Sequence, residues 1–151
     1  MKLCALLGKI TPEPEGGACW YENLTPTVAE RLTELLGDGV AGFVSNCEWD
    51  FALYCSETLT ALPGYDKSQL YLCLPHERQS ENWSESVRER YYDIHAQAET
   101  VEFVSREFTA DCYELCDKAI IDKCDLLFTN DSDCAAAEYA RATGKAIIIC
   151  K

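Results

Sequence analysis

Six short apolar runs alternate along the chain with longer segments of helical periodicity, and this alternation constrains the fold most. The runs lie at 2–8, 41–46, 69–75, 100–105, 125–130 and 146–150. Most are continuously apolar, as expected for strands that are covered on both faces. The fourth run instead alternates, with Val101 and Phe103 against Glu102 and Ser105. This pattern is typical of a strand at the edge of a sheet.

The segments between the runs carry apolar residues at helical spacing. They lie near 25–37, 51–62, 84–98, 112–120 and 134–143. Thr25 is a candidate N-cap followed by Pro26, Gly37 ends the first segment, and Gly144 follows the last. Alternating strands and helices predict an α/β fold, a doubly wound parallel sheet with helices on both faces. The length of 151 residues fits one domain.

The charge balance is strongly acidic, with 13 Lys and Arg against 26 Asp and Glu and a net charge of −13. This charge predicts that neither nucleic acid nor an anionic membrane is a partner, because both repel an acidic surface. A hydrophobic content of 48% excludes a disordered acidic tail. No apolar run approaches the ~20 residues of a membrane helix.

Ten cysteines occur, none of them in a Cys-x-x-Cys pair. The usual zinc and redox spacings are therefore missing. The first residues have neither the apolar length nor the cleavage pattern of a signal peptide. We expect a cytoplasmic protein with free thiols.

Ligands of open α/β sheets bind outside the carboxyl ends of the strands. The residues that follow the strands at this edge include Gly8, Lys9, Ser45, Asn46, Asn130, Asp131 and Ser132. They contain no glycine-rich phosphate loop. Ser132 or Asp133 is a candidate N-cap for the last helix, and Asp50 for the second. The alternative is an acidic pocket for a divalent cation, with the weak candidate ligands Glu48, Asp50, Asp131 and Asp133.

Four other residues carry reactive side chains. His76 follows the third strand and is either a general acid or base beside Glu77, or a surface or ligand contact. Cys47 precedes a helix N-terminus, which lowers the pKa of a thiol, although neighbouring acidic residues oppose this. Cys112 and Cys116 are spaced i, i+4 within the apolar stripe of Cys112, Leu115, Cys116, Ala119 and Ile120, which indicates core packing.

The chain resembles the YpsA-like branch of the SLOG superfamily over essentially its whole length, and most specifically from Leu74 to Asp125; matching stretches are 74–109, 116–130 and 137–149. That branch is similar to the LOG phosphoribohydrolases and the DNA-processing protein DprA. The matching positions are Pro75, Gln79, Trp83 and Tyr91, with the acidic positions Glu57 and Asp122. The glycine-rich ligand loops are degenerate here. The family's Gly-Gly-Thr before the last helix, for example, is Asp131-Ser132-Asp133.

The resemblance implies a three-layer Rossmann-like fold with strand order 4-3-2-1-5-6, and one such domain over residues 1–151. Superfamily members are thought to bind nucleotides or their derivatives. We therefore expect a small nucleotide-like ligand at the carboxyl ends of strands 1, 2 and 5, without a cofactor and without strong catalysis. The expected binding residues are Gly8, Lys9, Ser45, Asn46, Asn130, Asp131 and Ser132.

Two other functions stay open. The first is a LOG-like hydrolase of nucleotide or N-glycosidic bonds, with the weak catalytic candidates Glu57, Asp50 and His76. The second is an interaction module that forms a homodimer or larger homo-oligomer. Outer helices of such sheets commonly pair in this way.

Overall fold

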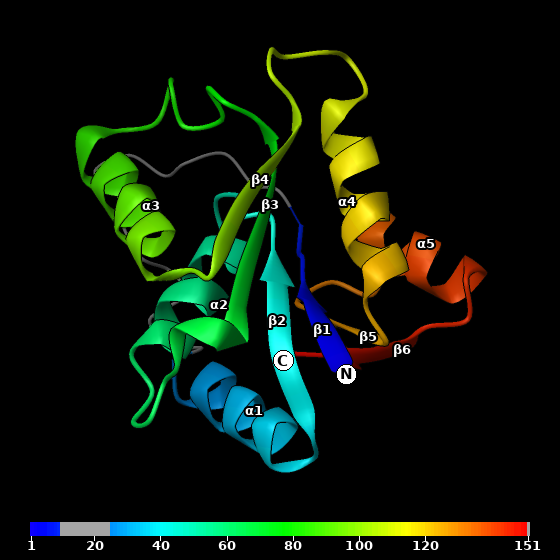
Figure 1. The fold of residues 1–151 in the computed structure, drawn as a ribbon. Helices are drawn as coiled ribbons and strands as arrows, with labels where there is room; N and C mark the ends of the chain where they lie inside the picture. The colour runs from blue at the N-terminus through cyan, green and yellow to red at the C-terminus, as the bar shows by residue number, and fades with distance from the viewer. Residues whose placement is uncertain (10–24, 151) are drawn as a thin grey trace.

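The computed structural model describes residues 1–9 and 25–150 and contains a six-stranded parallel sheet (Figure 1). The strands are β1 (Lys2–Leu6), β2 (Val40–Ser45), β3 (Leu70–His76), β4 (Thr100–Ser105), β5 (Leu126–Thr129) and β6 (Ala146–Ile149). Their order is β4-β3-β2-β1-β5-β6, which confirms the predicted order and the doubly wound fold. All five neighbouring pairs are parallel, as the intervening helices require.

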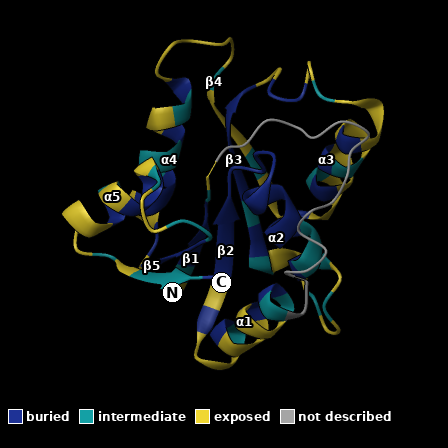
Figure 2. Cartoon of the chain, turned by 180° about the vertical axis from the view of Figure 1, so that it is seen from behind, coloured by how far each residue is buried: buried dark blue, intermediate teal, exposed yellow. Residues whose placement is uncertain are grey.

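Helices cover both faces of the sheet, which gives three layers (Figures 1 and 2). One face carries α1 (Thr25–Gly37), α2 (Phe51–Thr60) and α3 (Glu85–Gln97), and the other carries α4 (Cys112–Lys123) and α5 (Ala135–Ala142). A short 3₁₀ helix, η3 (Lys67–Gln69), precedes β3. None of the helices in the described part is long and apolar enough to cross a membrane.

Each face of the sheet has its own apolar core because successive strand residues point to opposite faces. On the first face, Leu6, Phe43 and Leu70 pack with the three helices there. On the second, Ala5, Val44 and Leu127 pack with α4 and α5. The alternation of neighbours such as Ala5 and Leu6 explains why the central strands carry apolar residues on both faces.

The edge position predicted for residues 100–105 is confirmed, since β4 pairs with β3 alone. Its side chains are largely exposed, including 41% of Phe103 and 37% of Val104. Within the stripe predicted on α4, Cys112, Cys116 and Ile120 are fully buried. Leu115 is 48% exposed and does not belong to the core. It lies one position before Cys116 and so points away from the sheet.

The helix ends agree with the predicted signals in part. Asp50 is the N-cap residue of α2, and Gly144 has the positive φ of 74° expected after α5. The N-cap of α5 is Cys134, so the prediction of Ser132 or Asp133 is wrong. Asp131 accepts from the Asp133 N–H instead, in a turn that delays the helix start. The irregular segment 10–24 lies outside the described residues.

Candidate functional site at the carboxyl ends of the strands

The strand order reverses between β1 and β5, which are neighbours in the sheet although three strands, β2, β3 and β4, lie between them in the sequence. The chain continues from β1 to α1 on one face, and from β5 to α5 on the other. The segments that follow these two strands therefore leave toward opposite faces of the sheet, and open α/β sheets bind ligands at such a point.

Gly8 and Asn130 meet at this switch point. The Lys9 backbone N–H donates to Asn130 Oδ1 at 3.1 Å. A Cβ atom placed on Gly8 would lie 2.6 Å from the same oxygen and 2.7 Å from Phe51 Cβ. Only glycine permits this approach of the two strand ends. The Lys9 side chain is exposed and supplies a cation at this point.

The turn after β2 is held by its own polar side chains. Ser45 Oγ accepts from the Cys47 N–H at 3.0 Å and from Ser56 Oγ at 2.8 Å. Asn46 Oδ1 accepts from the Glu48 N–H at 3.0 Å. Between them Cys47 takes a φ of 53°, in the left-handed region. Ser45 and Asn46 are both buried, and their side chains stabilise the conformation of this turn.

A continuous hydrogen-bonded group lies behind the turn, and we call it the acid network. Gln79 Nε2 donates to Glu48 Oε2 and to the Asn46 carbonyl, both at 2.9 Å. Tyr91 donates its hydroxyl to Gln79 Oε1 at 2.9 Å. The Asn46 side chain donates to Asp117 Oδ1 at 3.0 Å. The acid network consists of Asn46, Glu48, Gln79, Tyr91 and Asp117, and joins α3, the β2 turn and α4.

Both carboxyl groups of the acid network titrate close to neutral pH. Burial raises the pKa of Glu48 to about 7, although the hydrogen bond from Gln79 lowers it and Asp117 raises it further. Burial raises the pKa of Asp117 to about 6, with the bond from Asn46 opposing the shift. Buried carboxyls of this kind exchange a proton within the physiological range.

Two further candidate residues, Cys47 and Glu57, lie near this network, one as a buried thiol and the other in an ion pair. The Cys47 thiol is fully buried, and its pKa is raised well above the usual range by burial and by the charges of Glu57 and Glu48. The Glu57 carboxylate binds Arg90 in two places, at 2.8 Å and 2.6 Å. The Arg90 guanidinium also lies over the Trp49 ring, 5.6 Å from its centre. Glu57 thus joins α2 to α3.

His76 lies two strands away from the switch point, at the end of β3. Its Nε2 is 3.4 Å from the Tyr113 hydroxyl, and its Nδ1 accepts from the Arg78 N–H at 3.3 Å. The ring also contacts Phe108 edge-on, with 5.6 Å between the centres. His76 lines a groove of about 400 Å³ with Arg78, Arg106 and Phe108.

Two of the four acidic residues proposed for a cation, Glu48 and Asp131, accept hydrogen bonds from within the protein. Asp131 Oδ1 accepts the Asp133 N–H at 2.8 Å, and Glu48 accepts from Gln79. Across residues 1–9 and 25–150, no group of three or more His, Cys, Asp or Glu side chains is arranged to hold a metal ion.

The structure thus brings Gly8, Lys9 and Asn130 together, and links Asn46 to Glu48. Asp117 is the site residue that sequence reasoning missed. It lies beside the buried stripe of α4, one residue after Cys116 and three before Ile120. The sequence signal that could have identified Asp117 is its place as an acidic residue at the border of an apolar helical stripe.

Comparisons with known proteins agree with the fold. A model of the YpsA SLOG family matches residues 20–145. No curated protein matches the chain. Among solved structures, the fold is similar to DNA processing protein A from Helicobacter pylori, described for its single-stranded DNA binding mode, with a TM-score of 0.63 and 13% identity. The alignment covers 98% of this chain but 64% of that chain.

This likeness overturns the exclusion of nucleic acid as a partner, which we drew from the net charge of −13. The Helicobacter pylori protein, whose fold this chain resembles, binds single-stranded DNA. Net charge sums over the whole surface, whereas a nucleic acid meets only the local potential at its binding face. An acidic composition is therefore not sufficient to exclude it.

Proposed function

Because the chain belongs to the YpsA SLOG family, we propose that it binds a small nucleotide-like ligand at the carboxyl ends of β1, β2 and β5, without strong catalysis. The proposed binding residues are those that follow these three strands: Gly8, Lys9, Ser45, Asn46, Asn130, Asp131 and Ser132. The location follows from the reversal of strand order between β1 and β5.

The contact between Gly8 and Asn130 is the observation that carries this proposal. The bond from the Lys9 N–H to Asn130 Oδ1 fixes the plane of the side-chain amide. The Nδ2 group of Asn130 is then an oriented donor at the switch point, suited to a base or a ribose hydroxyl. Lys9 places one exposed cation next to it.

The charges nearby favour a ligand with few phosphates. Lys9 is the basic residue among the proposed binding residues, and Asp131 carries an opposing carboxylate. Asp131 Oδ1 also accepts the Asp133 N–H, a donor that a phosphate would otherwise use. We therefore expect a nucleoside or a nucleoside monophosphate rather than a triphosphate.

Isothermal titration calorimetry with adenosine, AMP and ATP, and with the guanine series, tests this function. The expected result is binding of a nucleoside or monophosphate in preference to the triphosphate. Lys9→Ala should weaken monophosphate binding roughly fivefold and leave nucleoside binding almost unchanged, because an exposed ion pair contributes ~1 kcal/mol or less.

Lys2→Ala is the matched control, because Lys2 is an exposed lysine at the amino end of β1, whereas Lys9 follows its carboxyl end. It should leave both affinities unchanged. The proposal is wrong if no nucleoside or nucleotide binds at millimolar concentration, or if Lys2→Ala and Lys9→Ala weaken binding equally.

Single-stranded DNA is the second candidate ligand, favoured by the likeness to the Helicobacter pylori protein. The groove beside His76 combines exposed Arg78 and Arg106 with Phe108, which is 65% exposed. Aromatic rings and arginines together are what single strands stack on and bind. Glu77 and Glu107 line the same groove and would weaken binding.

Fluorescence anisotropy of a labelled oligothymidine at low salt tests this candidate. Phe108→Ala should lower the affinity by roughly tenfold, since stacking contributes ~1–3 kcal/mol per base. Leu115→Ala, which removes an exposed apolar side chain on α4, is the control. If neither Phe108→Ala nor Arg106→Ala changes the affinity, the DNA binds to a surface other than this groove.

A further inference from the structure

Cys73 on β3 and Cys116 on α4 form a contact pair that the proposed ligand site does not use. The two sulfur atoms lie 4.0 Å apart, with Cys116 as the donor. The same Cys116 thiol also donates to the Cys73 carbonyl oxygen at 3.1 Å. These contacts hold the two sulfurs side by side across the boundary between the sheet and α4.

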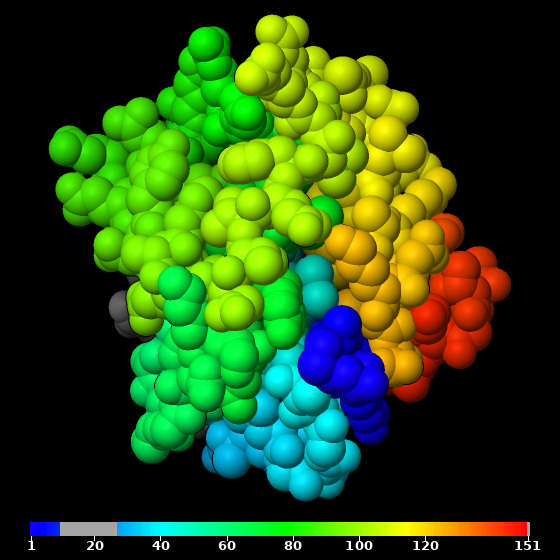
Figure 3. Space-filling model, in the orientation of Figure 1, coloured from blue at the N-terminus to red at the C-terminus, as the bar shows by residue number. Residues whose placement is uncertain are grey.

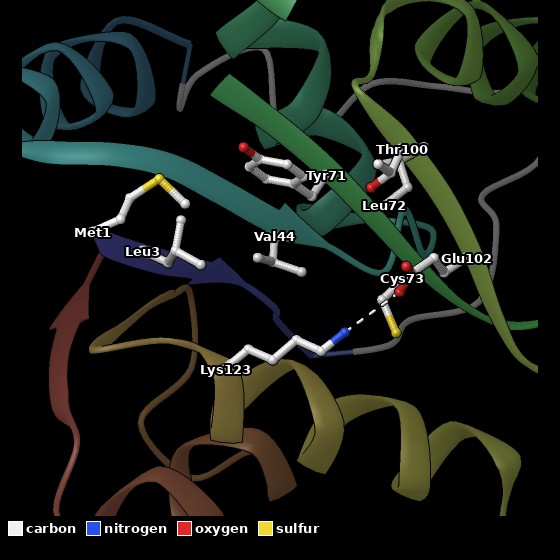
Figure 4. A pocket seen from close by; sticks show the side chains of 9 residues that line it. All are labelled: Met1, Leu3, Val44, Tyr71, Leu72, Cys73, Thr100, Glu102 and Lys123. Atoms are coloured by element: carbon white, nitrogen blue, oxygen red, sulfur yellow. Dashed lines mark hydrogen bonds and ion pairs between the residues drawn. The ribbon is translucent and has the colours of Figure 1, made fainter. Parts of the chain in front are cut away.

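The two thiols differ in their access to solvent. Cys116 is fully buried, whereas Cys73 retains 5% exposure and lines a groove of about 290 Å³. Figure 4 shows Cys73 at one end of this groove, with Glu102 and Lys123 beside it. In the space-filling view the sheet is visible at a hollow between the N-terminus and α4 (Figure 3). A small oxidant in the groove therefore reaches Cys73 before Cys116.

The surroundings of the pair also distinguish the two thiols chemically. The hydrogen bond from Cys116 lowers the pKa of Cys73, and the Lys123 ammonium adds to this effect, while burial and Glu102 oppose it. The same hydrogen bond and burial raise the pKa of Cys116. For comparison, burial raises the pKa of Cys55. Cys73 is thus the better nucleophile of the pair, and Cys116 keeps its proton.

We propose that Cys73 and Cys116 are a peroxide-sensitive dithiol that closes into a disulfide between β3 and α4. The Cys73 thiolate attacks one oxygen of hydrogen peroxide, which breaks the O–O bond and gives a sulfenic acid and, after protonation, one water. The Cys116 sulfur then attacks the Cys73 sulfur, so that the S–S bond forms and the S–O bond of the sulfenic acid breaks. The Cys116 proton passes to the departing hydroxide, which leaves as a second water. Two thiols lose two electrons and two protons, and one peroxide becomes two waters.

The closure requires only a small movement. A disulfide has sulfurs ~2.05 Å apart, so the pair must approach by roughly 2 Å, within reach of side-chain rotation and a slight shift of α4. Asp117 follows Cys116 directly and binds Asn46. The disulfide therefore changes the position of a helix that carries one carboxyl of the acid network.

Peptide mapping of the folded protein after brief treatment with hydrogen peroxide tests the proposal. Free thiols are blocked before denaturation and again after it. The expected product is a cross-linked peptide pair containing Cys73 and Cys116, lighter by two hydrogens and reversed by dithiothreitol. In Cys116→Ser, dimedone should label Cys73 as the trapped sulfenic acid. Cys73→Ser should slow oxidation of Cys116 roughly tenfold or more.

Cys112→Ser is the matched control, because Cys112 is a fully buried cysteine one turn earlier on α4. It should form the Cys73–Cys116 cross-link at the wild-type rate. The proposal is overturned if wild-type protein oxidises Cys73 without cross-linking it to Cys116. It is also overturned if the first cross-link joins other cysteines, or if neither residue reacts before the protein unfolds.

Discussion

The Asn46 side-chain amide donates to Asp117 Oδ1 at 3.0 Å and so joins the end of β2 to α4, although 71 residues separate the two in sequence. The oxygen of the same amide accepts the Glu48 N–H. Asn46 thereby connects two carboxyl groups whose pKa values burial raises to about 7 and about 6. A change in the protonation of Glu48 or Asp117 should therefore affect the other carboxyl through the Asn46 side chain.

Tyr91→Phe should destabilise the protein by about 1–2 kcal/mol. The substitution removes the donor to Gln79 Oε1 and leaves that buried acceptor without its bond. The ring itself stays, so packing against Trp83 at 5.3 Å between centres is preserved. Chemical denaturation measures the loss. Tyr92→Phe is the control, because Tyr92 is 55% exposed, and it should change stability by less than about 0.5 kcal/mol. Equal losses in the two variants would contradict a role for the Tyr91 hydroxyl.

Gly8→Ala should cost about 1–3 kcal/mol, because the new methyl group would lie 2.6 Å from Asn130 Oδ1 and 2.7 Å from Phe51 Cβ. Gly37→Ala provides the contrast within the same chain. No atom lies within 4 Å of a Cβ at Gly37, which ends α1, so the substitution should be neutral or stabilising. Relative to wild type, the denaturation midpoint of Gly8→Ala should fall, whereas that of Gly37→Ala should stay the same or rise. A neutral Gly8→Ala would mean that the switch point is not closely packed.

The fold was largely readable from the sequence because its signals are local. Apolar runs, helical periodicity and glycine stops depend on neighbouring residues, and the alternation of elements restricts the topology. The burial of Leu115 and the N-cap of α5 were mispredicted because they depend on contacts that local patterns do not show. Whether a residue near the rim of a stripe is buried depends on where the helix sits on the sheet, and the turn through Asp131 and Asp133 shifts the start of α5 by its own hydrogen bond.

The candidate site was less predictable because its contacts are long-range. Gly8, Lys9 and Asn130 share one edge by topology, so listing the residues after each strand was sufficient to find them. Gln79 reaches Glu48 from the turn after β3, and Asp117 reaches Asn46 from α4. Both contacts depend on side-chain orientation, which no local pattern encodes. The raised pKa of Glu48 likewise follows from burial, which is a property of the packed structure.

The ion pair of Glu57 and Arg90 should contribute stability, and Glu57→Gln should cost about 1–2 kcal/mol. Two short bonds and partial burial make it stronger than a surface pair. Arg90→Lys should also destabilise, because lysine loses the second bond and the stacking on Trp49. A double-mutant cycle measures the coupling. The exposed pair Arg31–Glu34, at 3.1 Å, is the control and should show a coupling of ~0.5 kcal/mol or less. Similar couplings for both pairs would refute this prediction.

Lowering the pH from about 8 to about 5 should stabilise the protein through Glu48. Its folded pKa of about 7 lies above the ~4.3 of an unfolded glutamate, so between these values the folded protein holds a proton that the unfolded chain has released. This contribution is present below the unfolded pKa and is lost as the pH rises through 7. Its full size is on the order of 3 kcal/mol.

Thermal and denaturant unfolding across this pH range should therefore show a free energy of unfolding that falls as the pH rises. Glu48→Gln should reduce this slope. Glutamine keeps an oxygen acceptor for Gln79 and carries no charge that burial would penalise, so the variant should be more stable than wild type at pH 8. Asp117→Asn should reduce the slope in the same sense at lower pH, because the Asp117 pKa is about 6. Glu89→Gln changes an exposed carboxyl on α3 and should keep the wild-type slope. If Glu48→Gln also keeps it, the Glu48 carboxyl is ionised in the folded protein throughout this range, and burial does not hold its proton.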